Sequence, residues 1–186
     1  MTERGQVTPG AGALSMDRLD VIAPGAFVAA VAPLFEGARG FLGRLAVARP
    51  FGSADAMFER AREIARAMPS EEQVELIDAH PRLGAPPVDV SALSFAEQGY
   101  DREERAAQAS RIASELDRLN AAYEARFGFR YCVFVAGRSR AELLPGMTAA
   151  LGADRDAEVA RALDAVVDIA RDRYATLTAQ GAEAVS

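Results

Sequence analysis

The chain has 186 residues, the size of one ordinary domain, and half of them are hydrophobic, which is enough to fill a single core. Its formal net charge of −6 repels phosphate backbones and argues against a nucleic-acid partner. One histidine and one cysteine supply too few nitrogen and sulfur ligands for a typical zinc site, whereas carboxylate-rich magnesium or calcium sites stay open.

Alanine, leucine, arginine and glutamate, which are good helix formers, dominate the sequence. They predict an all-α fold, a single-domain multi-helix bundle. Residues 1–15 are expected to form a flexible N-terminal tail, and residues 16–180 the helical domain. The expected helices cover residues 24–35, 38–47, 54–68, 70 to about 80, about 102–126, 139–151 and 154–180.

Capping residues and prolines set these boundaries. The expected N-caps are Ser53, Ser70, Ser94, Ser139 and Asp154. Pro81 ends the preceding helix near His80, because a proline disfavours helical backbone in the residue before it. Gly128 ends the long helix. Residues 131–135, the one strongly β-prone run, are expected to form a short buried extended segment without a partner strand.

No stretch is long and apolar enough to cross a bilayer, since the most apolar one, residues 26–35, is short and contains Pro33. The N-terminus lacks the hydrophobic run of a signal peptide. We therefore expect a cytoplasmic protein that does not bind membranes.

His80 is the first candidate for proton transfer, because imidazole is the side chain whose unperturbed pKa lies closest to neutral. It stands where a helix must stop, so its ring can leave the helix and point into a cleft. The alternative is a packed or surface histidine at a helix end, which is the more common case when nothing else is known.

Two further groups of polar residues could take part. Glu97, three residues after Ser94, could orient His80 or hold its proton, because a nearby carboxylate raises the pKa of an imidazole. Arg173 borders the apolar stripe of the last helix and could grip a carboxylate through two hydrogen bonds, with Arg171 as the competing choice. A plain capping box and a solvated arginine are the alternatives.

Short motifs follow one another along residues 17–178. They are Phe35-Glu36, Ala48-Arg49-Pro50-Phe51, Ala79-His80-Pro81-Arg82-Leu83-Gly84, Ser94-x-x-Glu97-Gln98, Leu119-Asn120-x-x-Tyr123-x-x-x-Phe127-Gly128-Phe129, the apolar run 131–135 and Ile169-Ala170-x-x-Arg173. In this order they resemble the 2-oxo-4-hydroxy-4-carboxy-5-ureidoimidazoline (OHCU) decarboxylase family.

The resemblance implies an all-helical homodimer, without cofactor or metal, that converts a small ureide, OHCU, to (S)-allantoin in urate breakdown. It implies that His80 is the catalytic acid or base, with Glu97 beside it, and that Arg173 binds a substrate carboxylate or ring oxygen. Loss of CO₂ leaves electron density that an adjacent ring carbonyl can take up and preorganised donors can stabilise. The expected substrate-binding residues are Pro81, Ser94, Phe95, Ala96, Glu97, Gln98, Tyr131, Cys132, Val133, Phe134, Val135 and Arg173.

Two departures from the family pattern leave the substrate open. Gly99 and Tyr100 directly follow the Glu-Gln pair, where the family has Ala-Gly-Leu-like residues, and Ala136 stands where many members have arginine. A divergent enzyme that acts on another ureido acid and a non-enzymatic helical interaction protein therefore remain alternatives.

Overall fold

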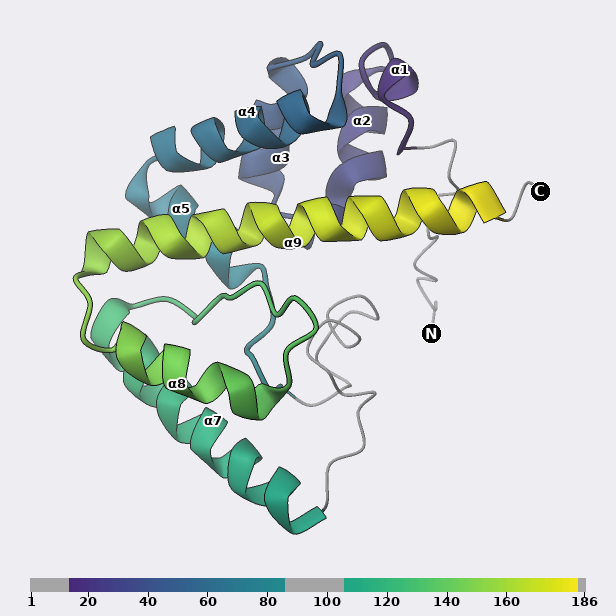
Figure 1. Ribbon diagram of the computed structural model, residues 1–186. Helices are drawn as coiled ribbons and strands as arrows, with labels where there is room; N and C mark the ends of the chain where they lie inside the picture. The colour runs from purple at the N-terminus through teal and green to yellow at the C-terminus, as the bar shows by residue number, and fades with distance from the viewer. Residues whose placement is uncertain (1–13, 86–105, 184–186) are drawn as a thin grey trace, which may run out of the picture.

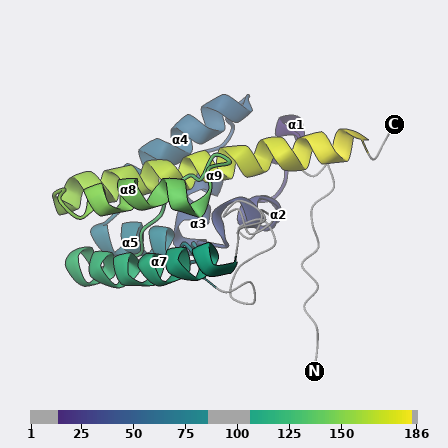
Figure 2. The ribbon, with the colours of Figure 1, turned by 60° about the horizontal axis from the view of Figure 1, so that its bottom comes forward.

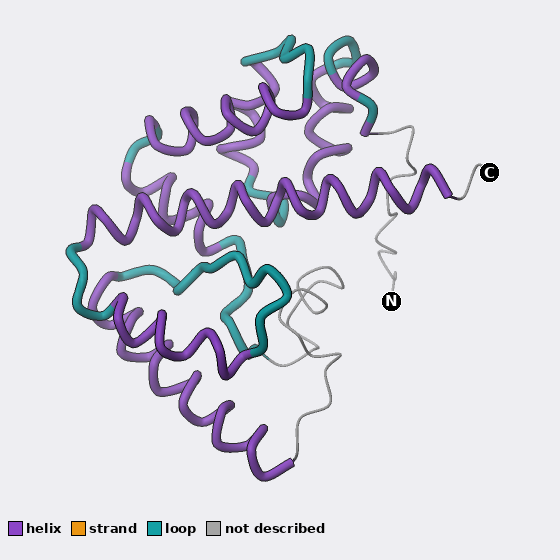
Figure 3. Tube along the Cα trace, in the orientation of Figure 1, coloured by secondary structure: helices purple, strands orange, loops and turns teal. Residues whose placement is uncertain are grey.

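The computed structural model of the chain describes residues 14–85 and 106–183, and within these residues it holds helices and loops but no strand (Figures 1 and 3). The predicted all-α fold is thus confirmed. The helices are α1 (Met16–Leu19), α2 (Pro24–Val31), the 3-10 helix η2 (Ala32–Phe35), α3 (Arg39–Val47), α4 (Ala54–Ala67), α5 (Ser70–Asp78), α7 (Ala106–Phe127), α8 (Arg140–Ala150) and α9 (Arg155–Glu183).

The longest helix, α9, crosses the middle of the molecule, with α1–α4 on one side and α7 and α8 on the other, while α5 passes behind it from one side to the other (Figure 1). Helices α4 and α5 and the 3-10 helix η2 pack directly against α9, while α7 packs against α8. In the turned view, α4 and α7 lie at opposite edges of the molecule (Figure 2). After α5 the chain lies on the same side of α9 as α7 and α8. The loop that joins α7 to α8 lies on this side too (Figure 1).

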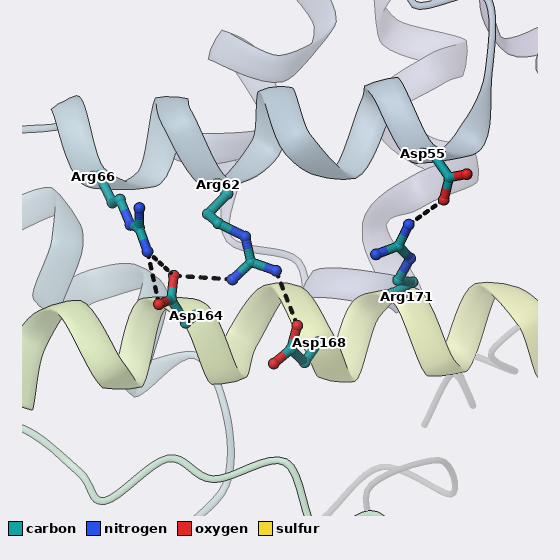
Figure 4. A network of polar contacts seen from close by, with 6 residues as sticks. All are labelled: Asp55, Arg62, Arg66, Asp164, Asp168 and Arg171. Carbon is teal, nitrogen blue, oxygen red and sulfur yellow. Dashed lines mark hydrogen bonds and ion pairs between the residues drawn. The ribbon is translucent and has the colours of Figure 1, made fainter.

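Ion pairs join α4 to α9 along one face (Figure 4). Arg62 bridges Asp164 at 2.9 Å and Asp168 at 3.0 Å. Arg66 binds Asp164 at 2.7 Å. Because these side chains are partly exposed, each pair contributes only about 0–1 kcal/mol. They therefore orient the two helices, and the buried apolar side chains between the helices supply most of the stability.

The predicted caps Ser53, Ser139 and Asp154 are confirmed, since each side chain accepts a hydrogen bond from the backbone N–H three residues on. Ser70 was wrong as a cap. It is the first residue of α5, Pro69 occupies the N-cap position, and no side chain caps this end. Pro69 has φ −54°, close to the value its ring imposes, so the chain enters the helix one residue earlier than expected.

The predicted helix from Pro24 to Phe35 is divided in two, because α2 ends at Val31 and continues as η2. Pro33 lacks the N–H that would continue the α-helical hydrogen bonds. Glu36 then adopts the left-handed region with φ 49°, which is uncommon for a residue other than glycine. This break brings Glu36 against α9, where its carboxylate binds an arginine.

Residues 131–135 form the predicted extended segment, and no strand pairs with it in the part of the chain that the structure describes. Tyr131, Cys132 and Val135 are buried, and Val133 and Phe134 are partly buried. Gly128 ends α7 with φ 78°, as predicted. The predicted start of this long helix, near residue 102, lies outside the described residues.

The folded part already includes residues 14 and 15, which the sequence placed in the N-terminal tail. Leu14 is fully buried and its carbonyl accepts a hydrogen bond from the Tyr174 hydroxyl at 3.1 Å. At the other end α9 continues to Glu183, past the predicted end at residue 180. Among the described helices, none combines the length and apolar character needed to cross a membrane.

Candidate active site

His80 lies directly after α5, where Pro81 follows the helix end as predicted. Its side chain is only 4% exposed. Arg130 holds this turn, since its Nη1 donates to the carbonyl oxygens of Asp78 at 2.8 Å and His80 at 3.1 Å. The backbone N–H of Arg130 also donates to the Asp78 carboxylate at 2.8 Å. The loop after α7 thereby fixes the backbone that carries the imidazole.

A cavity of about 130 Å³ lies beside His80. Its walls come from the turn after α5, the extended segment and α9. The described residues that line it are His80, Pro81, Leu83, Tyr131, Cys132, Val133, Phe134, Val135, Ala136, Gly137, Ile169 and Asp172. The structure thus brings together the predicted site residues His80 and Pro81 and the whole segment 131–135, although they come from separate parts of the chain.

Arg173 of α9 is 1% exposed and lies close enough to His80 for its charge to affect the imidazole. Its Nη1 donates to the carbonyl oxygens of Pro33 at 3.1 Å and Leu34 at 3.3 Å. Its Nη2 donates to the Glu36 carboxylate at 2.9 Å. A buried guanidinium is tolerated when a countercharge and hydrogen-bond acceptors surround it, and η2 with Glu36 supplies both.

Arg171, the competing choice, faces α4. Its exposed guanidinium binds the Asp55 carboxylate in the first turn of that helix (Figure 4). Helix α9 therefore presents Arg173 to the His80 side and Arg171 to the other. Contact between Arg173 and a substrate stays a prediction.

Burial lowers the pKa of His80 from 6.5 to about 4, and the nearby Arg173 charge acts in the same direction. The Glu36 carboxylate and the backbone of Leu76 oppose this shift. Within the described residues neither ring nitrogen makes a hydrogen bond of normal geometry. The Leu76 backbone is therefore near the ring without forming such a bond. The imidazole is therefore neutral at pH 7, a state in which one nitrogen can accept a proton and the other can donate a hydrogen bond.

This shift predicts a pH dependence of folding stability. Between pH 6.5 and pH 4 the unfolded chain binds a proton at His80 that the folded chain does not, so stability falls as the pH falls through this window. The loss is about 3 kcal/mol in order of magnitude, at 1.36 kcal/mol per pKa unit. Urea unfolding of the wild type and of His80→Leu, from pH 7 to pH 4, measures it as the difference between the two curves. Parallel curves would show that His80 titrates normally.

Several residues in and around the cavity were not predicted from the sequence. Leu83, Ile169 and Asp172 line the cavity without having been assigned to it. In the sequence, Glu36 is marked only by a Phe-Glu motif, which gives no sign that its carboxylate binds Arg173. Ala136, noted as a departure from the family pattern, lines the cavity with a left-handed φ of 49°.

Five predicted site residues, Ser94, Phe95, Ala96, Glu97 and Gln98, lie outside the described residues, and their places in the site stay predictions. In residues 14–85 and 106–183, no group of three or more histidine, cysteine, aspartate or glutamate side chains is arranged to hold a metal ion.

Comparisons with known proteins found a matching family model and related proteins. A family model described as OHCU decarboxylase matches residues 21–175. The OHCU decarboxylase of Haloferax volcanii is 26% identical over 162 residues, which cover 87% of this chain and 95% of that protein. The uric acid degradation bifunctional protein PucL of Bacillus subtilis is 28% identical over 171 residues, covering 91% of this chain. The match spans only 34% of PucL, about a third of its length.

A solved structure supports the fold. The crystal structure of an OHCU decarboxylase, determined in the presence of (S)-allantoin, matches with a TM-score of 0.63 at 20% identity over 80% of this chain and 96% of that one. At this identity the likeness establishes the helical architecture alone. The family model covers most of the chain, and on that ground the chain belongs to the OHCU decarboxylase family.

Proposed function

We propose that this chain decarboxylates OHCU to (S)-allantoin in urate degradation, with His80 as the acid-base residue. The observation that carries the proposal is the single histidine of the chain, buried on the wall of a cavity, neutral at pH 7 and beside the buried Arg173. Perturbed titratable groups on cavity walls are typical of active sites. Membership of the family supplies the substrate.

The proposed reaction begins with cleavage of the bond between the ring carbon and its carboxylate, which releases CO₂. The electron pair moves into the ring and passes through the adjacent C=N bond, rather than to a ring carbonyl, and the nitrogen of that bond takes a proton from water. The resulting enol loses its hydroxyl proton to neutral His80, and the protonated imidazole returns it to the carbon that bears the ureido group. Delivery from one face sets the (S) configuration, because a planar enol offers two faces.

The other site residues receive roles that support this sequence. Arg173 places a positive charge near His80, which favours binding of the substrate carboxylate and stabilises the anion that forms when CO₂ leaves. Residues 131–135 and Pro81 line the cavity and are proposed to contact the substrate. Glu97 is proposed to hold the imidazole, and Ser94, Phe95, Ala96 and Gln98 to complete the pocket.

The test is the rate at which purified protein produces the circular dichroism signal of (S)-allantoin from freshly prepared OHCU. Uncatalysed decay protonates both faces and gives a racemate, which has no such signal. We expect rapid growth of the signal with the wild type. Growth no faster than in buffer would overturn the proposed function.

A second substrate class is favoured by one observation. Ala136 lines the cavity at a position where many members of the resembling family carry arginine, so one positive charge is absent from this part of the wall. A cyclic ureido acid with an uncharged group at that end would fit such a wall. The second substrate class would be favoured if the wild type turned over that compound but not OHCU, and if His80→Leu turned over neither.

We further propose that the chain is a homodimer without cofactor or metal that works in the cytoplasm, as the family resemblance implies. Light scattering coupled to gel filtration measures the mass in solution. A mass near twice the 19.8 kDa of the chain is expected, and the mass of one chain would contradict the dimer.

A further inference from the structure

The extended segment 131–135 needs an explanation for its fixed position, because no strand pairs with it in the described residues. Buried backbone carbonyls that lack a sheet partner require other donors. Arginines supply several of them here, through their side chains and, at Val135, also through the backbone N–H of Arg138 at 3.0 Å. Arg161 Nη1 donates to the Cys132 carbonyl at 2.9 Å, and Arg138 donates to the carbonyls of Phe134 at 2.6 Å and Val135 at 3.0 Å.

Arg161 is itself fixed by a buried carboxylate. Its Nε donates to the two carboxylate oxygens of Glu158 at 3.1 and 2.9 Å. Glu158 is 4% exposed and also accepts a hydrogen bond of 2.7 Å from the hydroxyl of Tyr123, a fully buried residue of α7. Burial and this bond to Glu158 raise the pKa of Tyr123, so the phenol keeps its proton and remains a donor.

The same guanidinium also covers the first residue of the segment. Its Cζ lies 4.7 Å from the centroid of the Tyr131 ring, which also packs against the ring of Tyr123 at 5.1 Å. Arg161 therefore contacts both the side chain of Tyr131 and the backbone of Cys132, two residues of the cavity wall. Helix α7, the first turns of α9 and the wall meet at this one side chain.

Arg155, on the same helix, makes the same kind of contact elsewhere. Its Nε donates to the Phe127 carbonyl at 3.1 Å, and its Cζ lies 5.7 Å from the centroid of the Phe129 ring. Neither Phe127 nor Phe129 is among the residues that line the cavity. The two arginines thus differ in which backbone they hold, while the chemistry of the contact is alike.

We propose that Arg161, held in place by Glu158 and Tyr123, is a positioning residue that fixes the wall formed by residues 131–135 beside His80. It touches no substrate and acts through the Cys132 carbonyl and the Tyr131 ring. Its effect on turnover rests on the proposed function, but its effect on the wall does not. When the Arg161 hydrogen bond is lost, residues 131–135 should more often move away from the cavity. The population of this open state should rise about tenfold to a hundredfold, because a hydrogen bond from a charged donor is lost.

Cys132 gives a direct readout of the wall, because it is the only cysteine of the chain and is 4% exposed. The rate at which its thiol reacts with 5,5′-dithiobis(2-nitrobenzoic acid) measures how often the wall opens. We expect about tenfold to a hundredfold faster labelling in Arg161→Met than in the wild type, and an unchanged rate in Arg155→Met. If Cys132 is labelled through local opening, the labelling rate does not change at low urea concentrations. If it is labelled through global unfolding, the labelling rate rises steeply with urea.

Arg161→Met leaves the buried Glu158 carboxylate without its cation, and this variant could fail to fold. The double variant Glu158→Gln, Arg161→Met removes both charges and keeps the amide close to the Tyr123 hydroxyl. It is expected to label as fast as the single variant. Arg161→Lys retains one donor and should give an intermediate rate.

Turnover then separates a positioning role from a purely structural one. With OHCU, a loosened wall should raise KM and lower the enantiomeric excess of allantoin, while Arg155→Met keeps wild-type values of both. Wild-type labelling rates in Arg161→Met and in the double variant would overturn the inference. Faster labelling with unchanged KM and enantiomeric excess would also overturn it. Failure of the wild type to turn over OHCU would instead contradict the proposed function and leave the labelling result to decide on the wall.

Discussion

Replacement of His80 by leucine is expected to lower the turnover of OHCU sharply without destabilising the fold. General acid-base catalysis contributes about 10²- to 10⁴-fold, so kcat should fall by at least about 100-fold. The imidazole is buried and, within the described residues, has no hydrogen bond to lose. An unpaired buried polar group costs about 1–3 kcal/mol, so at pH 7 the free energy of unfolding should stay constant or rise by about 1 kcal/mol.

This combination distinguishes a catalytic histidine from a packed one. A histidine retained for packing would lose stability and activity together when it is replaced. Unfolding by urea and the initial rate with OHCU, measured on the same preparation, give both values. Full activity in His80→Leu would show that the proton is delivered by another group, and Glu97→Gln is then the next variant to measure.

Replacement of Arg173 by methionine is expected to cost far more stability than the same change at Arg171. Without its guanidinium, Glu36 and the carbonyls of Pro33 and Leu34 lose the donor that holds them. Breaking one partner out of a buried ion pair costs about 3–5 kcal/mol. The pair between Arg171 and Asp55 is exposed, so Arg171→Met should cost about 0–1 kcal/mol.

Arg171 and Arg173 lie two positions apart on the same helix, α9. Arg171→Met is therefore the matched control. Urea unfolding of both proteins measures the difference. For turnover, Arg171→Met should keep the wild-type KM, and any folded fraction of Arg173→Met should show a raised KM. Equal losses of stability in the two variants would contradict the buried network around Arg173.

Local sequence signals predicted much of this structure because their physical causes are local. Ser53, Ser139 and Asp154 cap helices through contacts three residues apart. Pro81 ends a helix through its own ring, and this placed His80 at a turn. Ser70 failed because Pro69, its neighbour, starts the helix equally well.

The contacts around His80 were not predictable in the same way, because they join residues far apart in the chain. Arg173 meets Glu36 across 137 positions, and Arg130 meets Asp78 across 52. No periodicity or spacing encodes such a pair. The left-handed backbone of Glu36, at a residue type that seldom adopts it, gave no signal either. The family resemblance indicated Arg173, but only the fold shows what holds it.

The most direct test of the central claim uses the fact that the chain has one histidine. With ¹⁵N-labelled histidine, the imidazole nitrogen resonances report the protonation of His80 and its contact with a ligand. We predict resonances of a neutral imidazole down to about pH 5 and a titration midpoint near pH 4. We also predict that these resonances shift when (S)-allantoin is added. Titration with a midpoint near 6.5, together with resonances that do not respond to (S)-allantoin, would contradict a buried neutral imidazole that serves this reaction.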